Sequence, residues 1–183
     1  MKKLLSVCLI AAMLASLLTA CGGKTSQQTT APTAAAVLEG SMEELLNRVV
    51  AERPVEFAGG VTTLNLADTS EDGQWVLKNY TGLEDASRIT DAAVFEPMIG
   101  SIAFSLVMVR VAPGQDSKAV AEDMKAGIDP AKWICVSADD MMAAGYGDVV
   151  MLIMLSSSLD MTAQSFVDAF AAVAGGELTF TIG

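Results

Sequence analysis

One short acidic segment has the residue types and spacing that begin a calcium-binding loop. Asp68, Ser70 and Asp72 place side-chain oxygens at alternate positions, and Gly73 supplies the bend at the sixth position. The twelfth position is Asn79, whose amide cannot give the bidentate carboxylate that closes such a loop. We therefore prefer the interpretation that the segment is a polar turn that caps a following helix, and keep a calcium site as the alternative.

Cys135 is a second candidate, because a cysteine can be either a reactive thiol or a buried apolar residue. It lies in the run KWICV, where strand alternation would place it on the same face as Trp133. A reactive thiol needs a cationic and partly exposed setting, and the chain contains no histidine that could activate it. We predict that Cys135 is a small buried hydrophobic residue of a strand, with a reactive thiol as the alternative.

Other polar clusters lack the partners that catalysis requires. Asp139 and Asp140 are adjacent, so they face opposite sides of a strand or are solvated in a turn, whereas glycosidase carboxylates face each other. Ser156–Ser158 follow an apolar run without the Gly-x-Ser-x-Gly elbow of a serine nucleophile. We predict a turn and a loop at these positions. Several methionines are predicted to fill the core rather than to bind copper: Met141, Met142, Met151 and Met154.

The composition excludes several classes of function. The 183 residues include 22 acidic and 11 basic side chains, which gives a formal net charge of -11, and this argues against a nucleic-acid partner. The absence of histidine excludes Ser-His-Asp and Cys-His catalysis and every imidazole-dependent metal site. No motif indicates a cofactor, so none is expected.

The N-terminus has the three regions of a bacterial secretory signal. Lys2 and Lys3 precede an apolar run of about 15 residues, and small residues then lead to Cys21. The run is shorter than the roughly 20 residues that span a bilayer. The sequence LTACG resembles a bacterial lipobox, in which the cysteine thiol receives a diacylglycerol and becomes the first mature residue. An ordinary signal peptide with a cysteine near its cleavage site is the alternative.

A lipobox would define the organisation of the whole chain. Residues 1–20 would be the signal peptide, and residues 21–37, small and polar with lipidated Cys21 at their start, would be a disordered tether. Residues 38–183 would be a single domain on the extracytoplasmic face of the cell membrane. Because the acylated cysteine is unavailable, Cys135 could form no disulfide within the mature chain, whose net charge would be -13.

Apolar periodicity predicts an α+β fold for that domain. A capping box at Ser41 and Glu44 starts the first helix, which ends before Pro54. Three further helices are predicted. The first covers residues 71–79, with Trp75 and Tyr80 as apolar anchors and Gly82 as its terminator. The others cover residues 117–127, capped by Asp116, and 161–173. Strands are predicted over residues 92–99, at a sheet edge because of Pro97, and over 102–111, 133–136, 149–155 and 177–182, with 61–66 as a strand or connector.

Two of these strands should lie at the centre of the sheet. Residues 102–111 and 149–155 are almost continuously apolar, which indicates burial on both faces. We predict a mostly antiparallel sheet with helices packed on one face. From residue 102 onward the order of elements matches a ferredoxin-like βαββαβ arrangement, preceded by the N-terminal helices. A different α+β meander is the alternative.

Several segments together resemble a family of Gram-positive bacterial lipoproteins known only as a domain of unknown function. They are the lipobox, the polar tether, the helix from Ser41, the YTG turn at residues 80–82, the KWICV run, and GDVV followed by LIM at residues 147–154. The resemblance covers about Ser41 to Phe170 and contains no catalytic motif. It implies a lipid-anchored cell-surface domain and leaves the activity open.

The sequence therefore predicts a non-enzymatic binding or interaction module, anchored through Cys21 and facing a protein or cell-wall partner. One alternative is a small envelope enzyme that uses carboxylates, with or without a divalent ion. Another is a structural component of an envelope complex. An enzymatic activity is less expected than binding, because no set of reactive residues converges in the sequence.

Overall fold

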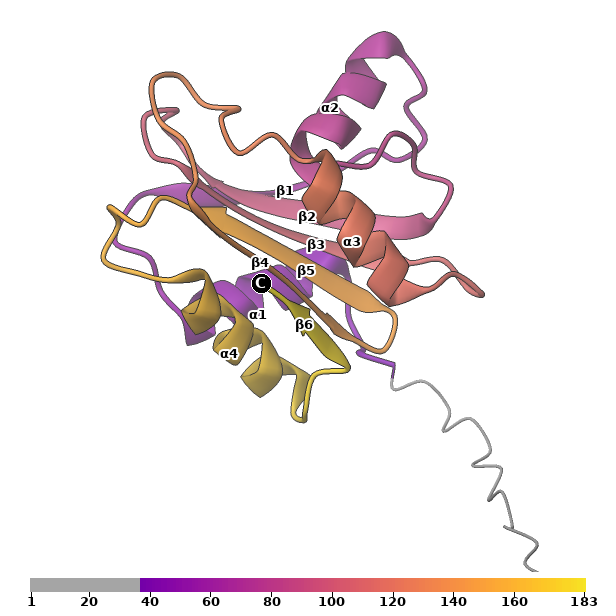
Figure 1. Cartoon of the computed structure of the whole chain (residues 1–183). Coiled ribbons are helices and arrows are strands. Elements are labelled where there is room, and N and C mark those ends of the chain that lie inside the picture. Colours follow the sequence, from indigo (N-terminus) through magenta and orange to yellow (C-terminus); the bar gives the residue numbers. More distant parts are fainter. Residues whose placement is uncertain (1–36) are drawn as a thin grey trace, which may run out of the picture. The chain divides into compact units, whose positions relative to one another are not determined.

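A computed structural model describes residues 37–183 of the chain (Figure 1). The predicted signal peptide, lipidated Cys21 and all of the predicted tether except Val37 lie outside the described residues. The described residues all belong to one compact unit. None of the helices within it is long and apolar enough to cross a membrane.

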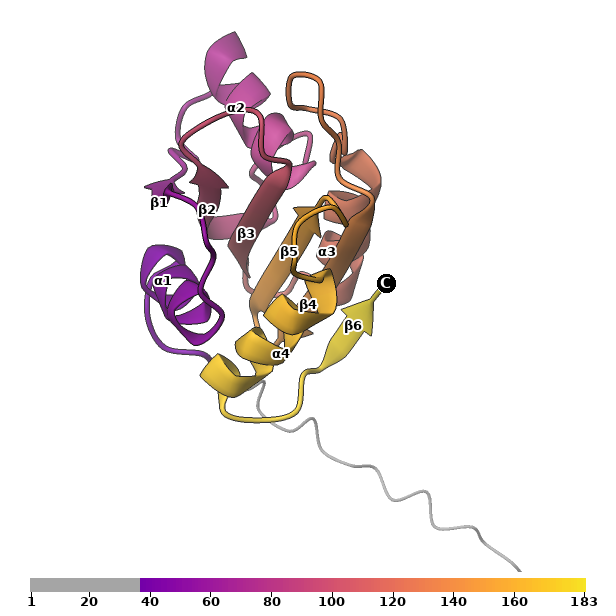
Figure 2. The same cartoon turned by 90° about the vertical axis from the view of Figure 1, so that its left-hand side faces the viewer.

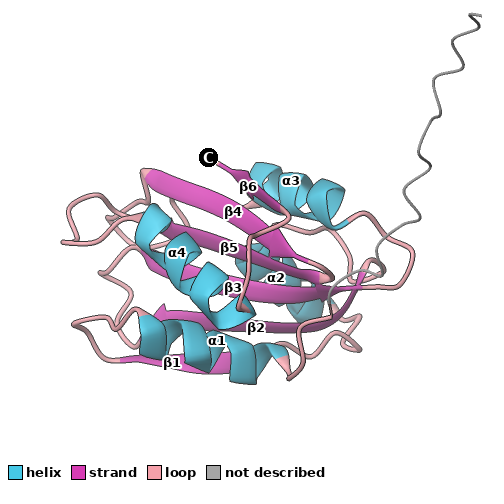
Figure 3. Cartoon of the chain, turned by 90° about the horizontal axis from the view of Figure 1, so that it is seen from below, coloured by secondary structure: helices cyan, strands magenta, loops and turns pink. Residues whose placement is uncertain are grey.

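Four helices and six strands make up the described part of the chain (Figure 3). In chain order they are α1 (Met42–Glu52), β1 (Gly59–Thr63), α2 (Glu71–Thr81), β2 (Ile89–Pro97), β3 (Phe104–Val111), α3 (Ser117–Gly127), β4 (Asp140–Tyr146), β5 (Val149–Leu155), α4 (Ala163–Ala174) and β6 (Phe180–Ile182). This is the α+β composition that the apolar periodicity predicts.

The strands form one antiparallel sheet in the order β1-β2-β3-β5-β4-β6. The two most apolar strands, β3 and β5, pair with each other at its centre, as predicted. All seven residues of β5 are buried. A strand that is covered on both faces needs apolar side chains at successive positions, which is why these two segments show no alternation.

The helices cover both faces of the sheet, so the prediction of helices on one face was wrong. Figures 2 and 3 show α1 and α4 together on one face, with α2 and α3 on the other. Alternation along β3 divides its side chains between two cores. Leu106 and Met108 pack toward α1 and α4, whereas Val107 and Val109 pack toward α2 and α3.

The ferredoxin-like prediction holds for three strands and fails at the fourth. β3 and β4 both pair antiparallel with β5, which lies between them, and this is the expected split βαβ unit. With the first and third strands central, the last strand should lie beside β3. Instead β2 occupies that place, and β6 pairs with β4 through Gly145 and Phe180.

The predicted strand over residues 133–136 is a loop, and the strand of this region is β4. The KWICV run at residues 132–136 forms no strand, whereas Asp140–Tyr146 pairs with β5 along its whole length. A tight hairpin at Gly147, whose φ of 59° lies in the left-handed region, fixes this register. Of the two residues predicted to form a turn, Asp140 is the first residue of β4 and Asp139 directly precedes it.

β2 is an interior strand, so its prediction as an edge strand was also wrong. It pairs with β3 on one side and with β1 on the other. Pro97 is tolerated because it is the last residue of β2, opposite Gly59 at the start of β1. The proline therefore marks the end of the strand and says nothing about its position in the sheet.

The predicted helix signals are confirmed at the N-termini of α1 and α3. Ser41 Oγ accepts from the Glu44 amide and the Glu44 carboxylate accepts from the Ser41 amide, which completes the capping box of α1. Asp116 caps α3 through two amides. In α2 the buried anchor is Leu77, whereas the predicted anchor Trp75 is 65% exposed. The last helix begins at Ala163, two residues later than predicted.

Candidate functional site

The loops at one end of the sheet lie opposite the end where the described chain begins. Arg110 Nη2 donates to the carbonyls of Leu38 and Gly40 at 2.9 and 2.7 Å, next to Val149 at the β4–β5 hairpin. The other end of β3, at Phe104, is roughly 20 Å along the strand from Arg110. The α1–β1, β2–β3 and β5–α4 loops meet there.

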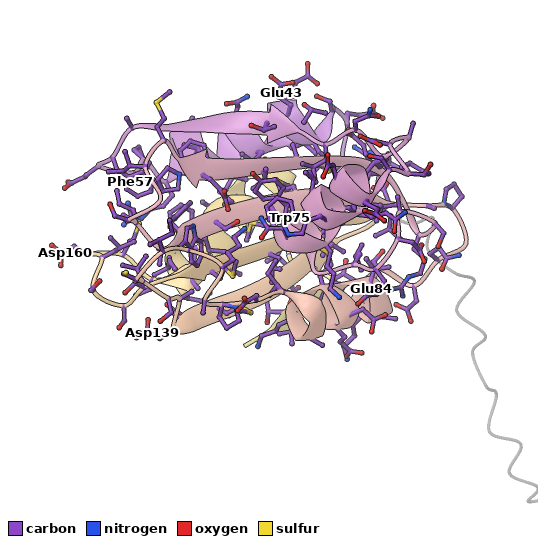
Figure 4. All side chains as sticks on the ribbon, turned by 90° about the horizontal axis from the view of Figure 1, so that it is seen from above. Glu43, Phe57, Trp75, Glu84, Asp139 and Asp160 are labelled. Atoms are coloured by element: carbon purple, nitrogen blue, oxygen red, sulfur yellow. The ribbon has the colours of Figure 1, made fainter. Side chains whose placement is uncertain are left out.

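A cavity of about 560 Å³ opens between these loops. Its volume lies in the range of small-molecule pockets. Figure 4 shows the side chains of Phe57 and Asp160, which both line it, at the same end of the domain. The complete lining is Arg53, Pro54, Glu56, Phe57, Ile102, Ser158, Leu159, Asp160 and Met161.

Arg53 places a positive charge in the wall of this cavity. Its Nη1 donates to the Pro54 carbonyl at 2.7 Å and its Nε to Ser165 Oγ at 3.2 Å. The guanidinium carbon lies 5.6 Å from the ring centroid of Phe166. None of the five ion pairs formed by residues 37–183 includes Arg53, and its Nη2 has no hydrogen-bond partner in this part of the chain.

A cluster of phenylalanines supports the apolar side of the cavity. Phe57 packs edge-on against Phe104 with ring centroids 5.2 Å apart, and Phe104 packs in the same way against Phe166. Phe104 and Phe166 are fully buried. Two elements that are distant in sequence, β3 and α4, therefore support Phe57, which lines the cavity together with the half-buried Ile102, Leu159 and Met161.

A second unusual feature is a buried ammonium group, on the opposite face of the sheet. Lys132 Nζ lies 2.6 Å from Glu96 Oε1, and the two side chains are 4% and 23% exposed. It also donates to the Asn79 carbonyl at 3.1 Å and to Ser105 Oγ at 3.2 Å. The rings of Tyr80 and Trp133 lie 4.7 and 5.4 Å from Nζ.

Burial dominates the ionisation of this cluster. Desolvation lowers the pKa of Lys132, and the negative charge of Glu96 opposes that shift. Burial, with a smaller contribution from Glu96, raises the pKa of Tyr80. A lysine beside a serine hydroxyl could activate a nucleophile, but Ser105 is 1% exposed. The contacts of Lys132 instead hold the α3–β4 loop against α2, β2 and β3.

Sequence reasoning placed no function on Lys132, and one signal could have drawn attention to it. The lysine follows Pro130 and precedes Trp133, away from the regular pattern of exposed charges on α3. Its partner Glu96 sits at the end of an apolar strand. What the sequence does not show is that the two segments meet, because 36 positions separate them.

The candidate calcium residues cap a helix, as our preferred interpretation predicts. Ser70 is the N-cap of α2, and its hydroxyl accepts from the Gly73 amide at 3.1 Å. Asp68 Oδ1 accepts from the Ser70 amide and hydroxyl, and these hydrogen bonds lower the pKa of Asp68. Asp72 lies in the first turn of α2, where a negative charge is favourable.

Cys135 is exposed, so its prediction as a buried strand residue was wrong. Its backbone has a φ of 63°, which interrupts any extended conformation at this position. The neighbouring Ile134 is 80% exposed, whereas Lys132 and Trp133 turn inward. Two adjacent inward side chains do not fit the alternation of a strand, so KWICV is a loop.

Asp139 and Asp140 hold the β5–α4 loop rather than face each other. Both oxygens of Asp139 accept from Ser157, from its amide at 2.5 Å and its hydroxyl at 2.7 Å, which lowers the pKa of Asp139. Asp140 Oδ2 accepts from the amide of Ala163 at the start of α4. The serine triplet is a loop that leads into α4, as predicted.

The methionines belong to the two cores, as predicted. Met151 and Met154 are buried and Met141 and Met142 are partly buried, on both faces of the sheet. Within residues 37–183, no three side chains of the Cys, Asp and Glu types are grouped so that they could hold a metal ion.

Comparison with known proteins adds no relative. The chain matches no protein-family model, no curated protein and no solved structure.

Proposed function

We propose that the chain is a lipid-anchored extracytoplasmic binding module, tethered through Cys21 to the outer face of the cell membrane. The single observation that carries the proposal is the LTACG sequence, which combines a leucine three positions before a cysteine with a charged and apolar leader. Diacylation and a further acyl chain on one cysteine would anchor the chain firmly. The partner would be another protein or a component of the cell wall.

The position of the cavity supports this proposal. The chain leads into the folded unit through Leu38, whose carbonyl is bound by Arg110 at the hairpin end of the sheet. The cavity beside Arg53 and Phe57 lies at the other end. An anchored domain would therefore have its membrane attachment at one end and this cavity at the other, where a partner has access.

The charge of the domain also fits a module held by acyl chains. All 22 acidic residues follow residue 37, and only eight of the basic residues do. A surface of this charge is repelled by anionic lipid headgroups, so electrostatic adsorption would not hold the domain on the membrane. Covalent lipid would be the attachment, and the repulsion would keep the domain surface in solution.

Acylation can be tested directly on the full chain in a bacterial host with lipoprotein processing. We expect the wild-type chain to incorporate a fatty-acid label, to lose residues 1–20 and to fractionate with membranes. The Cys21→Ser chain should incorporate no label and keep its leader, whereas a Cys135→Ser control should behave like the wild type. A wild-type N-terminus without acyl chains, by mass spectrometry, would contradict the proposal.

A further inference from the structure

The cavity beside Arg53 combines features that together select a particular ligand chemistry. Its wall contains one guanidinium, an apolar surface and, at the rim, the exposed carboxylates of Glu56 and Asp160. We propose that this cavity binds the C-terminal end of a short peptide whose last residue has an apolar side chain. The inference rests on the proposed function for its extracytoplasmic setting, and it names the class of partner.

The positive charge of Arg53 is the first argument. A strongly acidic chain offers many carboxylates that could neutralise an arginine, yet Arg53 pairs with none in residues 37–183. Its Nε and Nη1 are fixed by Ser165 Oγ and the Pro54 carbonyl, so the guanidinium plane is held in one orientation. The N–H groups of Nη2 can therefore donate to a bound ligand. A carboxylate is the acceptor that an arginine of fixed geometry binds best.

The apolar lining is the second argument. Phe57, Ile102, Leu159 and Met161 present half-buried side chains to the cavity. The ring of Phe57 is backed by Phe104, which is fully buried and cannot give way. A preformed apolar wall next to a fixed cation accommodates a carboxylate attached to an apolar side chain, which is the chemistry of a peptide C-terminus.

The acidic rim is the third argument, because it decides between anionic ligands. Glu56 and Asp160 are both exposed, and both line the cavity to which Arg53 belongs. A polyphosphate or a polyanionic sugar would meet these charges and be repelled. A peptide carries one carboxylate at its end and a neutral or positive chain behind it, so the same two carboxylates would favour it.

The test compares peptides that differ in one group. Calorimetry would use the full chain purified from whichever cell fraction contains it, with Ala-Ala-Leu as the free acid, its C-terminal amide, and Ala-Ala-Glu. We expect the free acid to bind at least about tenfold more tightly than the amide, because the amide loses the charge-assisted hydrogen bond to Arg53. Ala-Ala-Glu should also bind more weakly, because its second carboxylate meets the apolar wall and the acidic rim.

Arg53, the C-cap of α1, and Arg48, within α1, give a matched pair of variants. Arg53→Gln should bring the affinities for acid and amide together, whereas Arg48→Gln should leave their ratio unchanged. Arg48 also makes a backbone hydrogen bond, to the Val173 carbonyl, but does not line the cavity. Equal affinities of the wild type for acid and amide would overturn the proposal. So would no binding of any peptide at about 1 mM.

These outcomes are distinct from those of the acylation experiment. Peptide binding is measured on a purified chain and does not depend on whether Cys21 carries lipid. A chain that is acylated but binds no peptide would refute only the proposal that the cavity binds a peptide C-terminus. A chain that binds the peptide acid without being acylated would refute only the proposal that Cys21 carries a lipid anchor.

Discussion

The ammonium group of Lys132 lies 2.6 Å from the carboxylate of Glu96, and the two side chains come from a loop and a strand that are far apart in the sequence. The distance is short, but the geometry at Glu96 Oε1 is not that of a hydrogen bond. The attraction between the two opposite charges therefore holds the pair together.

Removing the charge of Lys132 should destabilise the domain. Lys132→Met leaves the Glu96 carboxylate without its partner, and we expect a loss of about 2–3 kcal/mol in the free energy of unfolding, measured with urea. The expected loss is below that of a fully buried pair because Glu96 is 23% exposed.

The double variant Lys132→Met, Glu96→Leu distinguishes a charge effect from a packing effect. Replacing both partners removes the uncompensated charge, so most of the lost stability should return. Lys118→Met is the control, since the side chains of Lys118 and Glu122 are both more than half exposed and their pair should contribute under about 1 kcal/mol. A Lys132→Met chain as stable as the wild type would contradict the prediction.

The contact between Asp139 and Ser157 should make the stability sensitive to acid. Hydrogen bonds from the hydroxyl and amide of Ser157 lower the pKa of Asp139 below its ordinary 3.8. A carboxylate with a lowered pKa in the folded state stabilises the fold above the unfolded value, and this contribution disappears as the pH falls through the folded value. The contribution of Asp139 should therefore be constant near neutral pH and decrease below about pH 4.

The measurement compares the wild type with Asp139→Asn between neutral pH and about pH 2.5. The difference in their free energies of unfolding should shrink on acidification, and NMR titration should give a lower pKa for Asp139 in the wild type than in Ser157→Ala. An Asp139 carboxyl that titrates at its ordinary value in the wild type would disprove the role of this contact.

The close approach of α2 and α3 should make Gly127 intolerant of a side chain. A Cβ at Gly127 would overlap the carbonyl oxygen of Gly82, and the backbone on both sides cannot move away independently. We expect Gly127→Ala to cost at least about 2 kcal/mol in the free energy of unfolding.

Two glycines in open space provide the comparison. Gly114 has a φ of 83° and no atom within 4 Å of the position that a Cβ would occupy, so Gly114→Ala should cost about 1 kcal/mol through backbone strain alone. Gly100 has neither restriction, and Gly100→Ala should be neutral. If Gly127→Ala were no worse than Gly100→Ala, the α2–α3 contact would be looser than the structure has it.

Cys135 should react with thiol reagents in the folded protein. Its side chain is exposed and its loop position leaves it accessible, so labelling should not require unfolding. Because its φ of 63° is unfavourable for a residue with a side chain, Cys135→Gly should retain or raise the stability, by up to about 1 kcal/mol. Labelling of the native chain only after denaturant is added, or a large loss in Cys135→Gly, would contradict the exposed left-handed conformation.

Local signals in the sequence predicted the helices well. The capping box at Ser41 and Glu44, the cap at Asp116 and the stop at Gly82 act over a few residues, so their effect can be read without the rest of the fold. The errors arose where a local pattern had two meanings. The run KWICV is compatible with a strand and with a loop that has Lys132 and Trp133 turned inward, and only the tertiary structure decides between them.

The placement of strands and helices depended on contacts that the sequence does not encode locally. β6 lies beside β4 and β2 lies beside β3, and neither pairing can be read from the residues of one strand alone. The second helical layer follows from the two-sided burial of β3 and β5. The continuous apolarity of these strands indicated that burial, although the prediction of helices on one face did not use it.

The sequence by itself determined the class of fold, the central strands, the helix caps and the prediction of a lipid anchor at Cys21, because each of these depends on neighbouring residue types. The tertiary structure decided that Arg53 and Phe57 share a cavity with Ile102 and Leu159, and that Lys132 meets Glu96. Such groupings depend on the folded path of a whole chain, since residues from separate segments meet only when the sheet and both helical layers have formed.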